Sequence, residues 1–457
     1  MKRKLLFIVL IVTLITFAAC GAPQEDEVVG GQGKNISSDA PQAQNGQTET
    51  EQAAPSQDAP SGSAETPTDN NAGAVQNTPS GENSGNSAAP SDDTPTSNND
   101  TKPSQGEQSD APAPGKTETP TLTDGLEYEP GTEVRWFGRT HVENDTYWFN
   151  YTDSGFEFSF YGTGAEAIFT SKNNYRGKTD EADHTAYIKV YVDGGKGTSV
   201  MIGDDMPTVT LASKLKRGNH TIRVVKRTNA RSSSCGLYSL TLAKGGKKLP
   251  PPTAKTRKIE FIGDSLTVGY GAIANASASA WSTKTEDGTV TYAALTAEKF
   301  NAEMQVVAVS GRGIVHNIRG DTDKTLPQMF RYTDIYNSNQ KWDYSRYQPD
   351  AVVINAGGND GSSGLTTDDE MRTAMTAFVA EIRKAYPKAH IFLMINPNRH
   401  DYSPIYKSIA ASQNNVHYVQ LPTLTAEQKA LGHPNVAGHK AWAAAVQAEM
   451  GKVMGWK

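Results

Sequence analysis

The stretch Ile259-Glu260-Phe261-Ile262-Gly263-Asp264-Ser265-Leu266-Thr267 decides the fold of the second half of the chain. Its first four residues are mainly apolar and end at a glycine, so they predict a buried strand followed by a tight turn. Ser265 stands directly after that turn, where a helix would begin. A serine at the end of a buried strand is placed for chemistry only if the rest of the chain supplies its partners.

Apolar strands and helical stretches alternate from this point to the C-terminus. This alternation predicts a parallel sheet covered by helices on both faces, a three-layer α/β domain over residues 257–457. Thr367 is the expected N-cap of one of the helices. The expected strands are 259–262, 305–309, 351–355 and 391–395, and the expected helices are 291–300, 368–386 and 439–450.

The preceding block, residues 125–247, has the pattern of an all-β domain. Apolar and polar residues alternate in 157–161, 187–192 and 220–225, and glycine-containing turns separate these stretches. Helical periodicity is absent, so we expect a β-sandwich of the jelly-roll type. A proline-rich linker, residues 248–256, joins the two blocks.

The first 20 residues have the pattern of an export signal. Three basic residues precede an apolar run, which is short for a membrane span, and small residues end at Cys20. Phe17-Ala18-Ala19-Cys20 resembles the cleavage box of bacterial lipoproteins, in which the cysteine is lipidated. An ordinary secretory signal and an uncleaved anchor are the alternatives. We therefore expect an exported protein held at the bacterial cell surface by lipid on Cys20.

Residues 21–124 are rich in Ser, Thr, Pro, Gln, Asn and Gly and have too few large apolar residues to form a core. They hold 17 acidic and three basic side chains, so the net charge of −6 of the whole chain originates here. We expect a disordered tether, or simply a solubilising spacer. With Cys20 lipidated, Cys235 has no intrachain disulfide partner and is expected to be a small buried residue.

Polar, glycine-rich turns follow three successive strands of the predicted sheet, and such turns meet at one sheet edge. Ser265 follows the first strand, Gly311 the second and Asn359 the third, while His433 precedes the last helix. A serine needs a base to become a nucleophile, and His433 is the candidate. The backbone N–H groups of Ser265 and Gly311 with the side chain of Asn359 are the candidate oxyanion hole.

Four sequence blocks together resemble the SGNH/GDSL hydrolase superfamily. They are Gly-Asp-Ser-Leu at 263–266, Val-Ser-Gly-Arg-Gly at 309–313, Gly-Gly-Asn-Asp at 357–360 and His-Pro at 433–434. Arg135-Trp136-Phe137-Gly138-Arg139-Thr140 and Thr285-Glu286-Asp287-Gly288 extend the resemblance to carbohydrate esterase family 2 over about residues 130–455.

This resemblance implies a serine esterase that removes acetyl groups from polysaccharides such as xylan and glucomannan and needs no metal or other cofactor. It also implies the same nucleophile, base and oxyanion-hole residues. One position departs from the superfamily, because Ala430 stands where an aspartate usually orients the histidine. Family members with a Ser-His pair use a backbone carbonyl instead, often beside a tryptophan that is Gly432 here.

Other polar residues have two interpretations each. Asp264 is expected to stabilise the turn, with substrate contact as a possible role, and Arg312 is expected either at the substrate or in a surface salt bridge. Asp360 is expected to be structural. His439 is a weaker candidate for the base, and the remaining histidines lack metal-ligand spacing.

Two clusters in the β domain also have two interpretations each. The aromatic residues 136, 137 and 147–149 fit a sandwich core better than a sugar platform. A basic cluster is expected to be a solvated strand face rather than a nucleic-acid site, because the chain is predicted to be exported. Its members are Lys214, Lys216, Arg217, Arg223, Lys226 and Arg227.

Three functions remain open from the sequence. The first is an O-deacetylase of acetylated polysaccharide, and the second uses the same chemistry on peptidoglycan or another cell-wall glycan. The third is a carbohydrate-binding protein without catalysis, which Ala430 and Gly432 suggest but the presence of Ser265, His433 and Asn359 disfavours. Oligomeric state has no sequence signal here.

Overall fold

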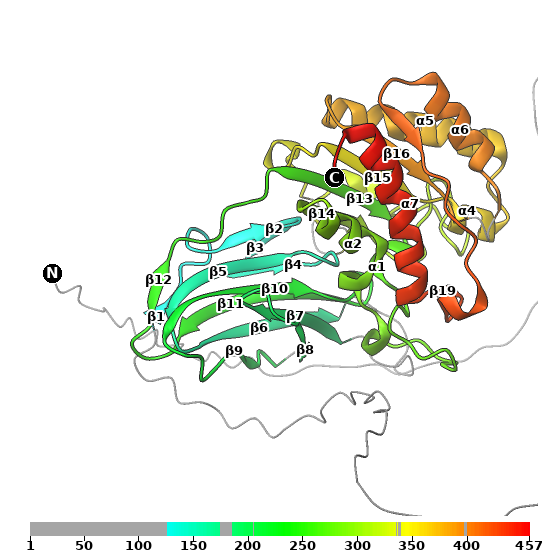
Figure 1. Ribbon diagram of the computed structural model, residues 1–457. Helices are drawn as coiled ribbons and strands as arrows, with labels where there is room; N and C mark the ends of the chain where they lie inside the picture. Colours follow the sequence, from blue (N-terminus) through cyan, green and yellow to red (C-terminus); the bar gives the residue numbers. More distant parts are fainter. Residues whose placement is uncertain (1–125, 174–184, 204, 335, 337–339, 397–399) are drawn as a thin grey trace, which may run out of the picture. The chain divides into compact units, whose positions relative to one another are not determined.

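The computed structural model describes residues 126–173, 185–203, 205–334, 336, 340–396 and 400–457. The expected signal peptide, Cys20 and the tether lie outside the described residues. Two folded blocks follow each other along the described chain, first an antiparallel β-sandwich and then a parallel α/β domain (Figure 1). The fold class expected from the sequence is confirmed.

Two six-stranded antiparallel sheets form the sandwich. One has the order β3-β4-β11-β6-β9 with β1 beside β11, and the other β12-β5-β10-β7-β8 with β2 beside β5. The first contains β1 (Leu126–Glu127), β3 (Thr140–Glu143), β4 (Thr146–Phe149), β6 (Ala165–Asn173), β9 (Thr208–Ala212) and β11 (Ser233–Leu242). The second contains β2 (Arg135–Phe137), β5 (Gly155–Gly162), β7 (Ala186–Val192), β8 (Thr198–Ile202), β10 (Gly218–Lys226) and β12 (Lys247–Leu249).

The sandwich core is rich in aromatic residues, because alternate residues of a strand face inward and many of the inward positions here are aromatic. Phe156, Phe158 and Phe160 of β5 are fully buried and pack against one another. Phe149 is also fully buried, and Trp136 packs against it in the same cluster. The core interpretation is therefore confirmed for Trp136, Tyr147 and Phe149, whereas Phe137 and Trp148 are buried outside this cluster.

The linker begins later than expected. Lys247–Leu249 form β12 and pair with β5, with Lys248 opposite Phe160. Lys248 and Leu249, which were expected in the linker, belong to the sheet instead, because an open edge of β5 provides backbone partners for them.

The α/β domain has a five-stranded, fully parallel sheet with the order β14-β13-β15-β16-β17. Helices α2 and α7 pack on one face, and α3, α5 and α6 pack on the other (Figure 1). The strands are β13 (Arg257–Gly263), β14 (Ala302–Ala308), β15 (Ala351–Asn355), β16 (His390–Met394) and β17 (Val416–Tyr418). The helices are α1 (Ser265–Val268), α2 (Tyr292–Lys299), α3 (Leu326–Phe330), α4 (Gly358–Ser363), α5 (Asp368–Ala385), α6 (Ser403–Ser412) and α7 (Val436–Met454).

The predicted elements of this domain are present, with small shifts at their ends. Thr367 caps α5, since its Oγ1 accepts a hydrogen bond from the Glu370 N–H at 3.3 Å. Helix α7 starts at Val436, so His439 lies inside its first turn instead of opening it. The sequence did not predict α6 or β17, because a ten-residue helix and a three-residue strand carry little periodic signal.

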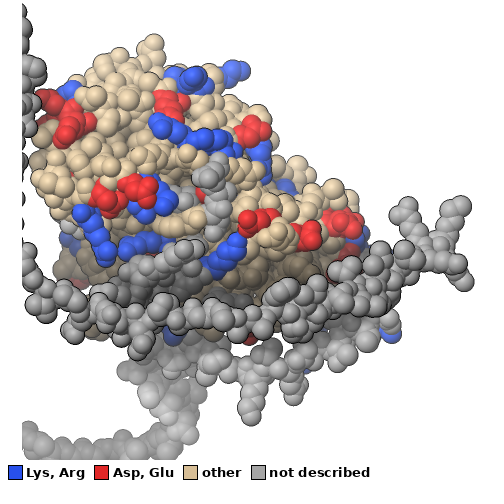
Figure 2. Space-filling model, turned by 180° about the vertical axis from the view of Figure 1, so that it is seen from behind, with Lys and Arg blue, Asp and Glu red and all other residues tan. Residues whose placement is uncertain are grey.

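The surface carries charges of both signs. On the face seen in Figure 2, basic and acidic side chains are interspersed. None of the helices in the described ranges combines the length and apolar character that crossing a membrane requires.

The basic cluster is only partly a solvated face. Lys214, Lys216 and Arg217 are exposed, but Lys226 and Arg227 are buried. Lys226 Nζ donates to the Thr228 carbonyl at 2.6 Å, while Arg227 donates to two carbonyls of the α/β domain. The expectation of a solvated face was wrong for Lys226 and Arg227, because the loop after β10 enters the junction between the two blocks.

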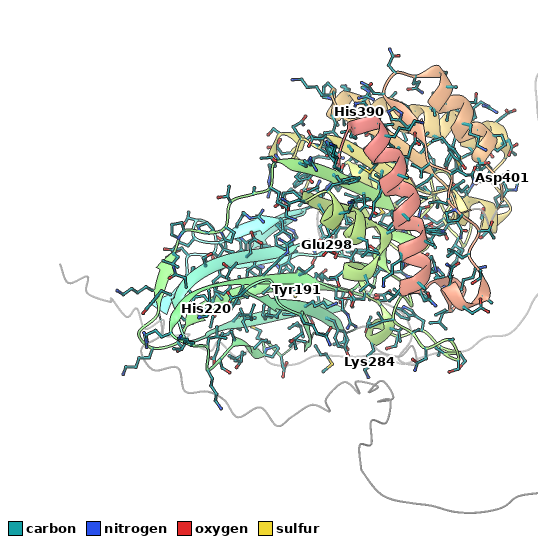
Figure 3. All side chains as sticks on the ribbon, viewed as in Figure 1. Tyr191, His220, Lys284, Glu298, His390 and Asp401 are labelled. Carbon is teal, nitrogen blue, oxygen red and sulfur yellow. The ribbon has the colours of Figure 1, made fainter. Side chains whose placement is uncertain are left out.

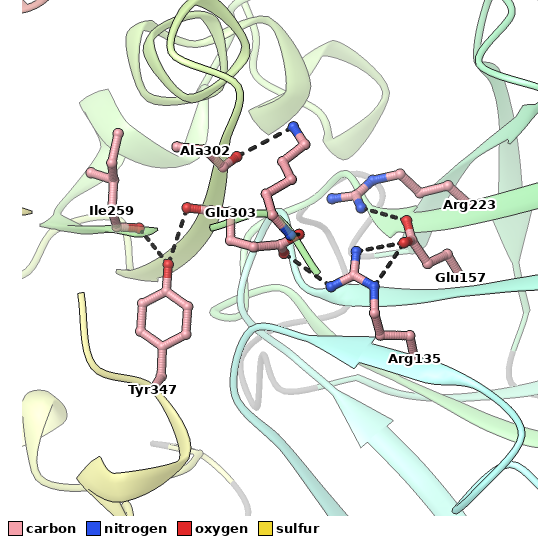
Figure 4. A network of polar contacts seen from close by, with 8 residues as sticks. Arg135, Glu157, Arg223, Ile259, Ala302, Glu303 and Tyr347 are labelled. Carbon is pink, nitrogen blue, oxygen red and sulfur yellow. Dashed lines mark hydrogen bonds and ion pairs between the residues drawn. The ribbon is translucent and has the colours of Figure 1, made fainter. Parts of the chain in front are cut away.

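A cleft of about 510 Å³ lies at this junction. Tyr191 of the sandwich and Glu298 of α2 line it from its two sides (Figure 3). Ion pairs between a half-buried arginine and two buried carboxylates line the cleft. Arg135 lies 2.5 Å from Glu157 of the sandwich and 3.1 Å from Glu303 of β14 (Figure 4). The contact with Glu303 joins the sandwich to the parallel sheet.

Arg139 makes a second link between the blocks. Its side chain is fully buried, and Nη2 lies 3.0 Å from Oε1 of Glu260 in β13. Nη1 donates to the carbonyls of Phe330 and Tyr332 at 2.7 Å. A buried guanidinium without such partners would cost several kcal/mol, so these contacts define how the sandwich meets the sheet.

Candidate active site

The turns after three parallel strands meet above the sheet, as the sequence predicted. Ser265 follows β13, Gly311 follows β14, Asn359 lies in α4 after β15, and His433 lies on β19 (His433–Pro434) just before α7. All four line one cavity of about 170 Å³. The other lining residues are Arg231, Asp264, Leu266, Tyr270, Ser310, Ile318, Gly358, Asn396 and Gly432.

Ser265 and His433 form a hydrogen-bonded pair. The Ser265 Oγ lies 2.8 Å from Nε2 of His433, and Nδ1 of the same ring lies 3.0 Å from the carbonyl oxygen of Leu431. A carbonyl can only accept, so Nδ1 carries the proton in the neutral ring and donates it to Leu431. Nε2 is therefore left as the acceptor for the serine hydroxyl, which is the arrangement that a general base needs.

A tight hairpin aims the Leu431 carbonyl. Strand β18 (Lys429–Ala430) pairs with β19, and Leu431 and Gly432 form the two-residue turn with φ of +50° and +72°. Both positive angles are typical of a type I′ turn, which leucine adopts at a cost of about 1–2 kcal/mol. Gly271 leaves room for the leucine, since a Cβ at that glycine would lie 3.2 Å from Leu431 Cδ1.

Ser265 and Gly311, whose backbone N–H groups are the candidate oxyanion hole, both line the cavity beside this pair. Ser265 starts α1, and Asp264 caps that helix by accepting a hydrogen bond from the Leu266 N–H at 3.0 Å. The N–H groups of Ser265 and Gly311 have no hydrogen-bond acceptor among the described residues. They are thus available to a ligand. Gly311 has φ of +82°, a conformation that favours glycine.

Asn359 reaches the cavity, but its amide group is already engaged. Its Nδ2 donates to Asp264 Oδ2 at 2.9 Å and to the Arg312 carbonyl at 2.8 Å. These two contacts use both of its N–H bonds. These contacts hold Asn359 in place beside the cavity. An oxyanion would have to compete with Asp264 or Arg312 for one of the two amide hydrogens.

The side chain of Arg312 does not line the cavity. Its Nη1 donates to the Asp323 carbonyl at 2.8 Å and lies 3.8 Å from Asp321. The structure therefore supports the salt-bridge interpretation. Asp360 is fully buried and accepts hydrogen bonds from the N–H groups of residues 314–316, which agrees with a structural role.

His439 is not placed to act as the base. It is 1% exposed and accepts a hydrogen bond from the Tyr292 N–H at 3.3 Å. Burial and, to a smaller extent, the nearby His433 lower its pKa to about 3.

Several residues of the site were missed from the sequence. Tyr270 packs against the His433 ring with centroids 4.5 Å apart, and Trp281 stacks on Tyr270. Tyr270 lies in the Gly-Tyr-Gly after the serine, a signal that could have been used. Arg231 belongs to the sandwich block, and nothing local in its sequence points to the cavity.

Among the described residues, no group of three His, Cys, Asp or Glu side chains could hold a metal ion. His390 on β16 and His417 on β17 are in hydrogen-bond contact, with ring nitrogens 3.0 Å apart.

Comparison with known proteins matches both blocks. Residues 136–252 match the Carbohydrate esterase 2 N-terminal family, and residues 261–441 match the GDSL-like Lipase/Acylhydrolase family. The fold and the site thus define a hydrolase of the GDSL class. Within that class, the pairing of the two domains places the chain in carbohydrate esterase family 2.

Individual relatives support this placement. The chain is 31% identical over 321 residues to cellulase/esterase CelE of Acetivibrio thermocellus, covering 67% of this chain and 38% of the length of CelE. It is 28% identical to an acetylxylan esterase / glucomannan deacetylase of Cellvibrio japonicus, covering 57% of this chain and 70% of that protein.

A solved family two carbohydrate esterase from Clostridium thermocellum, in complex with cellohexaose, has a similar structure. The TM-score is 0.65 at 28% identity, and the match covers 71% of this chain and all of that chain.

Proposed function

We propose that this protein is a serine esterase that removes O-acetyl groups from polysaccharide through an acyl-enzyme intermediate. The observation that carries the proposal is the 2.8 Å contact between Ser265 Oγ and His433 Nε2, with the Leu431 carbonyl on the other ring nitrogen. Serine, base and orienting acceptor are all in place without the usual aspartate.

In the proposed reaction His433 takes the proton of Ser265 as Oγ attacks the acetyl carbonyl. The oxyanion that forms is stabilised by the N–H groups of Ser265 and Gly311, and by Asn359 if its amide shares a hydrogen bond. As the bond between the acetyl carbon and the sugar oxygen breaks, His433 gives the proton to that oxygen, which leaves as a hydroxyl group. A water molecule, activated by the same histidine, releases acetate from Ser265.

The size of the cavity favours a small acyl group. At about 170 Å³ it is smaller than the roughly 300–1,000 Å³ of pockets that enclose a whole drug-sized ligand. An acetyl group fits such a space, and the sugar would remain at the mouth. Ile318, which is 45% exposed, gives that mouth an apolar edge.

The proposed substrates are acetylated xylan and glucomannan, as in the C. japonicus relative. Peptidoglycan or another acetylated cell-wall glycan is the second candidate, since the chemistry would be the same. The test is acetate release by the full chain from acetylated xylan, glucomannan and peptidoglycan, with Ser265→Ala as the control. Release that requires Ser265 supports the esterase, and its absence on every polymer and on small acetyl esters contradicts it.

We also propose that the protein is exported and anchored by lipid on Cys20. The support is the sequence Phe17-Ala18-Ala19-Cys20 after the apolar run. Expressed in a bacterium, the wild-type chain should partition into detergent and incorporate labelled fatty acid, whereas Cys20→Ala should do neither. Equal labelling of the two proteins would contradict the anchor.

A further inference from the structure

Glu286 is a fully buried carboxylate that the proposed mechanism does not use. It ends the short 3₁₀ turn Thr283–Thr285 in the Thr-Glu-Asp-Gly block. Its two oxygens accept hydrogen bonds from different directions. Oε2 accepts from the backbone N–H of Asn229 at 3.0 Å, and Oε1 accepts from the Trp281 indole N–H at 3.2 Å.

The first contact leads to the oxyanion hole. Asn229 lies in the loop between β10 and β11 of the sandwich and is 1% exposed. Its Nδ2 donates to Ser310 Oγ at 2.7 Å, and Ser310 directly precedes Gly311. Its Oδ1 accepts from the N–H of Arg231, which lines the cavity. A shift of Asn229 would therefore move the segment that carries the Gly311 N–H.

The second contact leads to the base. The Trp281 ring stacks on Tyr270 at 5.5 Å with an interplanar angle of 8°, and Tyr270 packs on His433. The indole hydrogen bond fixes Trp281, Trp281 limits the position of Tyr270, and Tyr270 limits the tilt of the imidazole. The histidine is thereby held by an aromatic contact as well as by the Leu431 carbonyl.

We propose that Glu286 is a positioning residue that fixes the oxyanion-hole segment and the catalytic histidine relative to each other. Through the contact of Glu286 with Asn229, the sandwich takes part in the active site. The proposal rests on the esterase function above. It assigns a role to the Thr-Glu-Asp-Gly block and to the sandwich loop that a purely accessory N-terminal domain would not have.

The charge of Glu286 bears on this role. Burial raises its pKa to about 7, against hydrogen bonds from Asn229 and Trp281 and the nearby cations Lys226 and Arg227, which lower it. The ionised form is the better acceptor for both N–H donors. The pH profile of kcat should therefore contain a step near neutral pH that arises from ionisation of Glu286.

The test compares Glu286→Gln with Glu303→Gln in the full chain. Glutamine keeps the size but offers only one acceptor to two N–H donors. The kcat for a small acetyl ester such as 4-methylumbelliferyl acetate should fall about 10- to 100-fold, with KM changed less than about twofold, because misplacement acts on the transition state. Glu303→Gln breaks the ion pair with Arg135 at the same junction, and neither residue lines the active-site cavity, so kcat should be unchanged.

Single-arm variants sharpen the test. Trp281→Phe keeps the ring and removes the indole donor, and Ser310→Ala removes the acceptor for Asn229. Each should lower kcat by less than Glu286→Gln does, and each should have a smaller effect when Glu286→Gln is already present. The neutral-pH step should be missing from the pH profile of Glu286→Gln.

Two outcomes would overturn the inference. One is a kcat for Glu286→Gln equal to that of Glu303→Gln, and the other is a kcat loss that simply follows the fall in Tm across all variants. Labelling of Ser265 by a serine-directed organophosphonate distinguishes failure of the positioning role from failure of the proposed esterase function. It needs only a reactive Ser265, so slower labelling of Glu286→Gln would support the positioning role even if no acetylated substrate were turned over.

Discussion

The carbonyl oxygen of Leu431 lies 3.0 Å from Nδ1 of His433, and Leu431 holds this position with φ of +50°. The carbonyl of an apolar residue in a left-handed turn therefore contacts the ring nitrogen that an aspartate side chain contacts in Ser-His-Asp hydrolases. A neutral carbonyl fixes the tautomer as an aspartate would, but it stabilises the imidazolium less. The site keeps its geometry and gives up part of the electrostatic assistance.

Restoring the aspartate should not improve the enzyme. In Ala430→Asp the new carboxylate would be buried, since Ala430 is 3% exposed. It would also lack the expected partner, because Nδ1 of His433 already donates to the Leu431 carbonyl. A buried charge without a partner costs roughly 3–5 kcal/mol. We expect a lower Tm and a kcat no higher than wild type, measured by thermal unfolding and acetyl-ester hydrolysis.

Ala437→Asp is the matched control for that change. Ala437 is exposed in the first turn of α7, where a negative charge is favoured by the helix dipole. Its Tm should stay within a few degrees of wild type. A kcat for Ala430→Asp several-fold above wild type would show that the aspartate can replace the carbonyl.

Gly311→Ala should damage catalysis more than stability. The residue has φ of +82°, and a Cβ there would lie 3.2 Å from Ile318 Cγ2, so the segment must shift. Gly455→Ala has the same type of backbone strain at the end of α7, with nothing within 4 Å. Both should lose about 1–2 kcal/mol of unfolding free energy. Only Gly311→Ala should lose kcat, by about 10-fold or more, and an equal loss in both variants would contradict a role for the Gly311 N–H.

Asn359→Ala should lower kcat by about 10²- to 10³-fold with little change in KM, if its amide turns from Asp264 or Arg312 towards the oxyanion. The measurement is steady-state hydrolysis of a small acetyl ester by folded protein. If both amide hydrogens stay on Asp264 and Arg312 throughout the reaction, kcat will fall less than threefold, and the hole will consist of two backbone N–H groups.

The parts of this structure that were predictable are those with a local signal. The strands β15 and β16 are almost wholly apolar, and β13 ends in the apolar pair Phe261-Ile262 before its glycine. Ser265, Gly311 and Asn359 follow the ends of their strands closely in the sequence. Parallel topology then brings those residues to one edge, whatever the details of packing.

The parts that were missed depend on contacts between distant segments. Arg231 reaches the cavity because the loop after β10 inserts into the junction, and no local pattern encodes that insertion. The role of Leu431 lies in its carbonyl, which every residue has, so its side chain gave no signal. The solvated face assigned to Lys226 and Arg227 was wrong for the same reason, since alternation along β10 does not say what covers the strand.

Asp153 should make stability depend on pH in the neutral range. It follows β4, is 3% exposed, and its Oδ2 has no hydrogen-bond partner within the described ranges. Burial and then the neighbouring Asp287 raise its pKa to about 8, against smaller opposite effects of Arg223 and Lys189. In the unfolded chain the pKa is near the ordinary value of about 3.9.

The native state therefore holds a proton on Asp153 between about pH 4 and pH 8 that the unfolded state has lost. Stability from this residue is highest at low pH and declines as pH rises through that window, by at most about 1.4 kcal/mol per pH unit. Asp153→Asn keeps the shape and the positive φ but has no proton to lose. In urea unfolding from pH 5.5 to 8.5, wild type should lose stability relative to Asp153→Asn, whereas parallel curves would mean that Asp153 is already ionised in the native protein.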